Sequence, residues 1–123
     1  AEDGIRDVER SRGLGDVYKR QVVVHRWDRK IDGPVTEESL RKKLEDKGYR
    51  VSRYTYSPGT YFSNHKHGQS KIDAVLSGTF RMGMYGEFVD LGPGDWIEVP
   101  AGATHSAEVI GNDSVVSLDA VRN

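Results

Sequence analysis

The fold of this chain is decided by two stretches, GTYFSNHKHGQSKIDAVLSG at residues 59–78 and GDWIEVPAGATH at residues 94–105. His65 and His67 are two positions apart, so on a strand their side chains lie on one face, about 7 Å from each other. Two imidazoles placed in this way can converge on one metal ion at about 2.0–2.1 Å. The turn that precedes His105 reverses the chain, so a third imidazole is expected to arrive from another strand. We therefore predict one metal ion held by three histidines.

Outside these stretches, short apolar runs alternate with glycine-containing turns. The β-branched run VVVHRW at 22–27 predicts a first strand. A single amphipathic helix is expected at 36–47, with Thr36 as its N-cap and Gly48 as its end. After Gly48 the apolar residues recur with period two, and strands are expected around 50–57, 60–63, 71–76, 79–85, 87–91, 96–99, 105–110 and 115–120. One short N-terminal helix followed by many strands indicates an all-β domain, a closed or sandwiched antiparallel β-barrel.

The two stretches resemble the two sequence motifs of the cupin family. The first family motif is a glycine, five residues, His-x-His, three or four residues, a glutamate, six residues and a glycine. The second is a glycine, five residues, Pro-x-Gly, two residues, a histidine, three residues and an asparagine. The spacings of both motifs fit this chain, on Gly59, His65, His67, Lys71, Gly78, Gly94, Pro100, Gly102, His105 and Val109. The resemblance covers residues 22–121 and implies a jelly-roll barrel with a mononuclear metal site.

The chain departs from the family pattern at two positions. Lys71 stands where the family has its glutamate ligand, and Val109 stands where it has asparagine. A lysine ammonium has three donors and no lone pair, so the predicted site keeps only neutral imidazole ligands. We expect Lys71 either to position an anionic oxygen or substrate carboxylate, or to pair with Asp73. Gln69 shares the parity of Lys71 if the segment is extended, and we predict it as a fourth, weak metal ligand and, with Lys71, as a catalytic residue.

Three imidazoles without a carboxylate suit copper, iron, nickel or zinc better than magnesium or calcium. We expect copper first and iron second, followed by zinc or manganese. The first functional hypothesis is an oxidoreductase that activates oxygen or peroxide. The chain also resembles compact copper cupins of metagenomic origin that oxidise cellulose, which implies oxidative cleavage of a polysaccharide. The alternatives are a non-redox metal lyase or isomerase acting on a small molecule, and a sensor cupin that binds one.

Composition bears on the partners of the protein. The formal net charge of the 123 residues is −1 and acids and bases are interleaved, which argues against nucleic-acid and anionic-membrane partners. The absence of cysteine excludes disulfides and thiolate ligands. We expect a carbohydrate or small-molecule substrate. We also expect a homodimer, because the strand at 22–27 would present an uncovered sheet edge.

Residues 1–21 differ from the rest in composition. Their end, GLGDVYKRQ, resembles translated adaptor sequence, and we predict an arm, cloning-derived or disordered, that precedes a cupin domain at 22–123. The alternative is a genuine arm that packs on a neighbouring molecule. The segment lacks the apolar core of a signal peptide. Localisation stays open: secreted if the substrate is a polysaccharide, and cytoplasmic otherwise.

Overall fold

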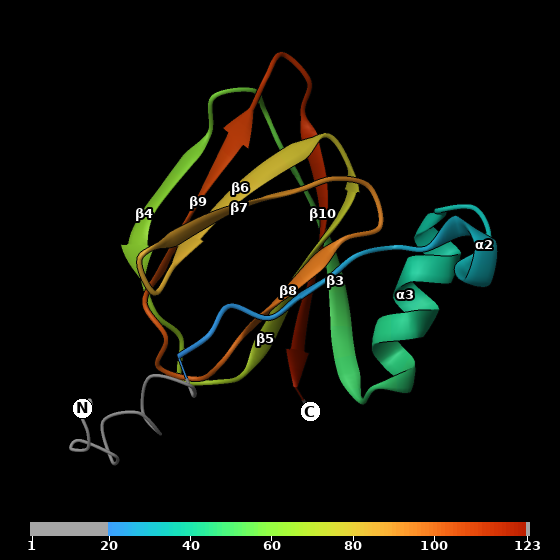
Figure 1. Ribbon diagram of the computed structural model, residues 1–123, viewed down its shortest axis with the longest axis horizontal. Coiled ribbons are helices and arrows are strands. Elements are labelled where there is room, and N and C mark those ends of the chain that lie inside the picture. The colour runs from blue at the N-terminus through green and yellow to red at the C-terminus, as the bar shows by residue number, and fades with distance from the viewer. Residues whose placement is uncertain (1–19, 123) are drawn as a thin grey trace, which may run out of the picture.

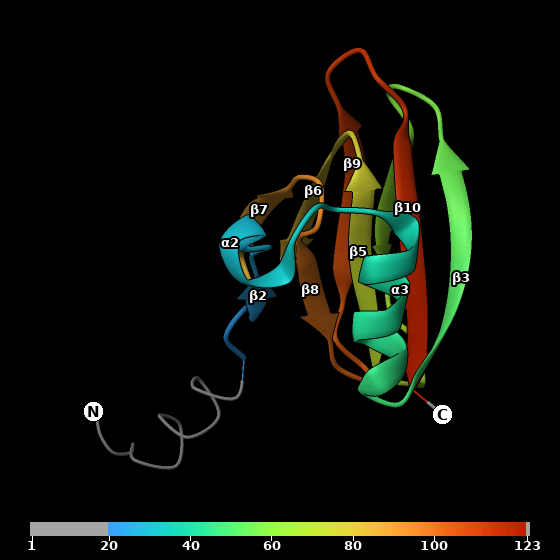
Figure 2. The ribbon, with the colours of Figure 1, turned by 90° about the vertical axis from the view of Figure 1, so that its right-hand side faces the viewer.

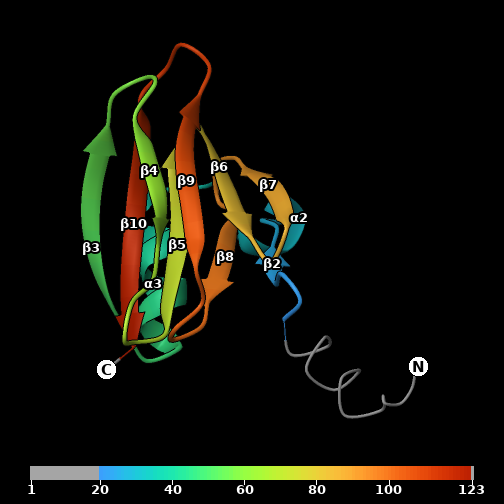
Figure 3. The same cartoon turned by 90° about the vertical axis from the view of Figure 1, so that its left-hand side faces the viewer.

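The computed structural model describes residues 20–122 and consists of two antiparallel sheets that face each other (Figure 1). The five-stranded sheet has the order β2 (Val24–His25), β8 (Trp96–Val99), β5 (Lys71–Ser77), β10 (Val115–Arg122) and β3 (Tyr49–Tyr56). The four-stranded sheet has the order β4 (Tyr61–His65), β9 (His105–Ile110), β6 (Thr79–Met84) and β7 (Glu87–Leu91). Figure 3 shows β4 and β9 of the four-stranded sheet on the side that faces the viewer. The predicted all-β jelly-roll barrel is confirmed.

Strand alternation divides the apolar residues into two cores. The first core lies between the sheets and contains Val75, Met82 and Leu91, all at most 1% exposed. The second core lies on the outer face of the five-stranded sheet and contains Ile72 and Leu118, at most 2% exposed. Because side chains alternate along β5, Ile72 points outward while its neighbours in sequence point into the barrel. The inner face of this sheet is therefore free to contribute polar groups to an interior cavity.

Helix α3 (Glu37–Asp46) covers the second core. Its first turn has a capping box: the Thr36 side chain accepts from the Ser39 backbone N–H, and the Ser39 side chain accepts from the Thr36 backbone N–H. Leu40 and Leu44 are fully buried, one turn apart on the face that meets the sheet. Figure 2 shows the helix lying across the outer face of β5 and β10. The helix predicted at 36–47 is therefore present, and it sits on the opposite side of the sheet from the histidines.

We expect Leu44→Ala to destabilise the protein by about 2–5 kcal/mol, because it leaves a cavity between helix and sheet. Ile31→Ala is the matched control, since the Ile31 side chain is 82% exposed and its truncation should change stability very little. Urea unfolding of the three proteins measures the difference. A Leu44→Ala variant as stable as Ile31→Ala would show that α3 contributes little to the folded state.

The N-terminal part of the domain differs from the expectation in two places. Only Val24–His25 of the predicted strand pairs in the sheet, opposite Ile97 and Trp96 of β8. A second helix is present where only the one at 36–47 was expected: DRKIDG at 28–33 contains the one-turn helix α2 (Arg29–Asp32), which the Asp28 side chain caps by accepting from the Lys30 backbone. β2 lies at the sheet edge, and the homodimer stays a prediction.

Of the predicted arm at 1–21, residues 1–19 lie outside the described residues. Neither helix in the described range has the length and apolar character to span a membrane.

Candidate metal centre

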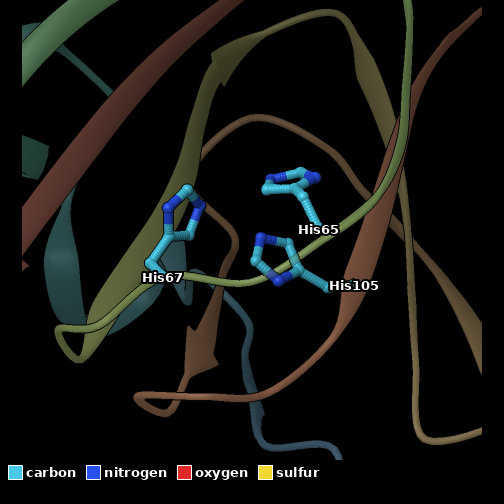
Figure 4. A group of neighbouring side chains, drawn as sticks. All are labelled: His65, His67 and His105. Atoms are coloured by element: carbon cyan, nitrogen blue, oxygen red, sulfur yellow. The ribbon is translucent and has the colours of Figure 1, made fainter.

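Three histidines from two strands and one loop meet at one end of the barrel interior. His65 is the last residue of β4, His67 lies two residues beyond it in the connection to β5, and His105 opens β9. His65 and His105 are direct cross-strand partners, which fixes their separation through the β4–β9 pairing. The candidate ligand nitrogens of all three side chains lie within 4.8 Å of one another. Figure 4 shows the three rings turned toward a common point.

Backbone carbonyls orient two of the imidazoles. Nδ1 of His65 lies 2.7 Å from the carbonyl oxygen of Ser63, and Nδ1 of His105 lies 2.9 Å from that of Ala103. A carbonyl oxygen only accepts, so each Nδ1 carries the hydrogen and donates it. The lone pair is then left on Nε2 of each ring. Metal-binding histidines in proteins are oriented by this kind of hydrogen bond.

The electrostatic surroundings of His67 and His105 favour the neutral form, which is the form that binds metals. Burial, together with the positive charge of Lys71, lowers the pKa of His67 below its usual 6.5. Burial also lowers the pKa of His105, whose side chain is 2% exposed, and this effect outweighs the hydrogen bond to Ala103. Both rings are therefore neutral at pH 7. Nitrogens that share one ion at about 2.1 Å are at most about 4.2 Å apart, so small ring rotations complete the site and the residues fit a transition metal ion.

The histidines open into a cavity of about 240 Å³ inside the barrel. One part of its wall is aromatic: the ring of Tyr56 lies 4.9 Å from that of Phe62 and 5.7 Å from that of Phe80, centroid to centroid. Another part, supplied by the five-stranded sheet, is ionisable and consists of Lys71, Asp73 and Asp119. The cavity thus combines a nitrogen-ligand cluster, an apolar wall and a set of ionisable groups.

Lys71 is the first residue of β5, and its side chain lines this cavity. The sequence suggested Asp73 as its partner, but the structure pairs it with Asp119. Its Nζ lies 3.0 Å from Oδ2 of Asp119 on β10, and the two side chains are 14% and 19% exposed. Asp119 was missed in the sequence. The available signal is its position as the lone acid in the apolar strand VVSLDAV at 115–121, on the inward parity of Val115. Its pairing with Lys71 could not be inferred, because 48 residues separate the two.

Asp73 lies directly opposite Asp119 in the β5–β10 register. Burial, followed by the negative charge of Asp119, raises the pKa of Asp73 to about 7. Burial and the same two carboxylates raise the pKa of Tyr56 to about 12. Near neutral pH the inner wall therefore contains the Lys71–Asp119 ion pair and an Asp73 carboxyl that still carries a proton in a large share of the molecules.

The raised pKa of Asp73 gives a testable pH dependence of stability. Its pKa is about 7 in the folded protein against an ordinary 3.8, so the folded state binds more protons between these values. Stability should consequently fall as pH rises from about 4 to about 7. Asp73→Asn removes this loss, so the metal-free variant should be more stable than wild type at pH 8, by at most about 4 kcal/mol. Urea unfolding of wild type and Asp73→Asn at pH 4 and pH 8 measures this difference in stability. An Asp73→Asn protein less stable than wild type at pH 8 would contradict the raised pKa of Asp73.

The structure does not bring Gln69 to the histidines. β4 ends at His65, and Gln69 is an exposed residue of the bend before β5, outside the residues that line the cavity. The prediction that Gln69 faces the histidines required an extended chain from His65 to Lys71. The bend at 68–69 interrupts the alternation of side chains in this segment. Val109, at the family's asparagine position, is 3% exposed and packs in the core between the sheets. That position therefore serves packing in this chain.

The comparison with known proteins agrees with this arrangement. The cupin domain family matches residues 52–121, and the chain belongs to that family. No curated protein sequence matches the chain. No finding supports the finer resemblance to the copper cupins that oxidise cellulose.

Solved structures share the fold. A predicted oxalate decarboxylase from Thermotoga maritima is 28% identical with a TM-score of 0.55, over 66% of this chain and 72% of that one. A cupin protein from Bacteroides fragilis is 23% identical with a TM-score of 0.54, over 65% and 73%. KdgF from Halomonas sp. is 22% identical with a TM-score of 0.51, over 63% and 81%. The last two likenesses concern the fold alone.

Proposed function

We propose that this cupin is a mononuclear metal enzyme that acts on a small, oxygen-bearing molecule held inside the barrel. The observation that carries the proposal is the convergence of three imidazoles on a cavity with ionisable groups in its wall. A metal with open positions would supply Lewis-acid or redox activation of an oxygen atom there. His65, His67 and His105 would be its ligands, and the Lys71 ammonium would attract the anionic part of the molecule.

Redox chemistry is the first form of this proposal. A site of three imidazoles without a carboxylate favours copper or iron over harder ions. Either metal can undergo one-electron chemistry with oxygen or peroxide, as an oxidoreductase requires. For a polysaccharide such as cellulose, a cavity of about 240 Å³ would admit one end of the chain and not its middle. Copper-dependent oxidation of a chain end or of a small sugar is therefore the specific reaction to examine first.

A non-redox lyase is the second form, and the comparison with the Thermotoga maritima protein favours it. That protein is described as a predicted oxalate decarboxylase, and oxalate is a small dianion. A carboxylate of this size would fit the cavity and meet the ammonium of Lys71, which is 14% exposed. The two forms differ in the metal that they need, because zinc supports only the non-redox reaction.

The deciding experiment is elemental analysis and EPR of protein purified without added metal. The proposal expects close to one transition metal ion per chain, with copper or iron indicating the redox form and zinc the lyase. The same protein is then assayed for peroxide-driven oxidation of cello-oligosaccharides and for decarboxylation of oxalate. Protein that contains no metal and takes none up from copper, iron or zinc salts would overturn the proposal.

A further inference from the structure

The inner wall opposite the histidines contains a chain of three ionisable side chains. Lys71 Nζ donates to Oδ2 of Asp119 at 3.0 Å. Asp119 lies directly across the β5–β10 pairing from Asp73, and the two carboxyl groups are within hydrogen-bonding reach. All three side chains line the same cavity as the three histidines. The chain thus runs from an ammonium through a carboxylate to a second carboxyl group.

One atom in this chain shows where a proton belongs. Oδ1 of Asp119 is shielded from solvent, and no donor among the described residues reaches it when Asp73 is a carboxylate. A buried acceptor without a donor is costly, and two carboxylates facing each other repel. Both costs disappear when Asp73 is protonated and donates to Asp119. Lys71 neutralises Asp119, which makes Asp73 the member of the pair that holds the proton.

We propose that Asp73, Asp119 and Lys71 form a proton-donating subsite, in which Asp73 passes a proton to an oxygen of a small carboxylate or other oxyanion bound between it and the histidines. The inference rests on the proposed function, because it names how that cavity recognises and protonates its molecule. Neither Asp119 nor Lys71 transfers the proton itself: Asp119 is a positioning residue that accepts from Asp73, and Lys71 keeps Asp119 ionised and attracts the bound oxyanion.

The transfer balances without an external reactant. The O–H bond of Asp73 breaks, its proton forms a bond to the oxyanion, and the electron pair left behind makes Asp73 a carboxylate. The ammonium of Lys71 then stabilises the carboxylates of both Asp73 and Asp119. Water at the cavity mouth afterwards returns a proton to Asp73. No electron enters or leaves. The ionisable groups that share the cavity with Asp73, and so bear on the pH range of this step, come from five strands and one loop: Lys71, Asp119, Tyr56, His65, His67 and His105.

The first test examines the proton itself in metal-free wild-type protein. The ¹³Cγ resonances of Asp73 and Asp119 are followed by NMR from pH 3 to pH 9. The proposal expects the Asp73 resonance to move with a midpoint near 7, in keeping with its raised pKa. Titration of both carboxyl groups below about pH 5, as for exposed aspartates, would overturn the subsite. This outcome depends on neither metal nor activity, so it is distinct from a failure of the proposed function.

The second test examines transfer to a bound oxyanion, with acetate as the probe and the redox-inert zinc form of the protein. Calorimetric titration at pH 8 in buffers of different ionisation enthalpy counts the protons taken up per acetate bound. Wild type should take up close to one proton, because the anion draws a proton onto the Asp73 subsite. Asp73→Asn, which keeps a donor but has no transferable proton, should lose this uptake while retaining its zinc.

The matched control is Asp90→Asn. Asp90 is an aspartate on the outer face of the four-stranded sheet, paired with Arg81 at 2.8 Å, and it should leave the proton uptake unchanged. Equal uptake in wild type and Asp73→Asn would contradict the inference. Loss of zinc from Asp73→Asn would do so as well, since Asp73 would then act as a metal ligand.

Discussion

Replacing His105 with alanine is expected to remove stoichiometric metal binding, with an affinity at least about 100-fold lower than that of wild type. Outer hydrogen bonds to metal ligands are already worth about 10–100-fold in affinity, and His105 is itself a proposed ligand. Its ring is 2% exposed and is oriented by the Ala103 carbonyl at 2.9 Å. Among the three histidines it is thus the most buried and the least able to be replaced by a solvent molecule without rearrangement.

The control for this experiment is His25→Ala, the fourth histidine of the chain. His25 lies on β2, stacked on Trp96 and 2.6 Å from the carboxylate of Glu98, away from the cavity. Elemental analysis of the three proteins, purified in parallel, gives the metal content. Thermal unfolding with and without added metal gives a second readout, because a ligand that binds only the folded state raises the melting temperature. Full metal content in His105→Ala would refute the three-histidine site.

The loss should be specific to metal binding and leave the barrel folded. His105 opens β9, whose pairing with β4 and β6 continues for the rest of the strand through backbone hydrogen bonds. Removing the imidazole also removes a group whose pKa is lowered by burial, which the protein must keep neutral. We therefore expect the metal-free variant to unfold at a temperature close to that of metal-free wild type. A collapse of the fold in the absence of metal would show that the ring is a structural element.

Much of the fold and of the histidine cluster could be predicted because both rest on local patterns. The four-residue spacing of Leu40 and Leu44 places both on the helix face that packs on the sheet, and alternation along β5 separates that face of the sheet from the face that lines the cavity. The motif spacing fixes His65, His67 and His105 relative to their turns. The sequence says less about a side chain whose position depends on a local bend or on the pairing of distant strands. Gln69 falls in a bend that parity does not describe, and the residue opposite Lys71 is determined by the β5–β10 register.

The largest effect on the fold is expected from Gly78→Ala, at the glycine that ends the first motif. Gly78 has φ +86° in the turn between β5 and β6, a region that costs residues with a side chain about 1–2 kcal/mol. A Cβ at this position would also lie 2.4 Å from the carbonyl oxygen of Ser114 and 3.0 Å from Cα of Val115, both backbone atoms of the neighbouring β9–β10 connection and β10. Backbone atoms cannot rotate away, so the sheet itself would have to shift.

Gly111→Ala separates these two causes. Gly111 has φ +85° in the connection after β9, and a Cβ there would meet nothing within 4 Å. Its substitution should cost only the backbone strain of about 1–2 kcal/mol, whereas Gly78→Ala should lose on the order of 4 kcal/mol or more. Urea unfolding of both variants measures the difference. Equal losses would mean that the glycine is needed only for its backbone angle.

The same comparison bears on why the motif ends in glycine. Gly78 lets the β5–β6 turn approach β10 closely, and β10 is the strand that carries Asp119 toward Lys71. A displaced β10 would lengthen the Lys71–Asp119 contact and move Asp119 away from Asp73, its partner across the sheet. Gly78→Ala protein that still folds at low temperature should therefore show an Asp73 carboxyl titrating below its wild-type midpoint. Gly111→Ala should leave that midpoint unchanged, because the bulk added at Gly111 meets no neighbouring atom.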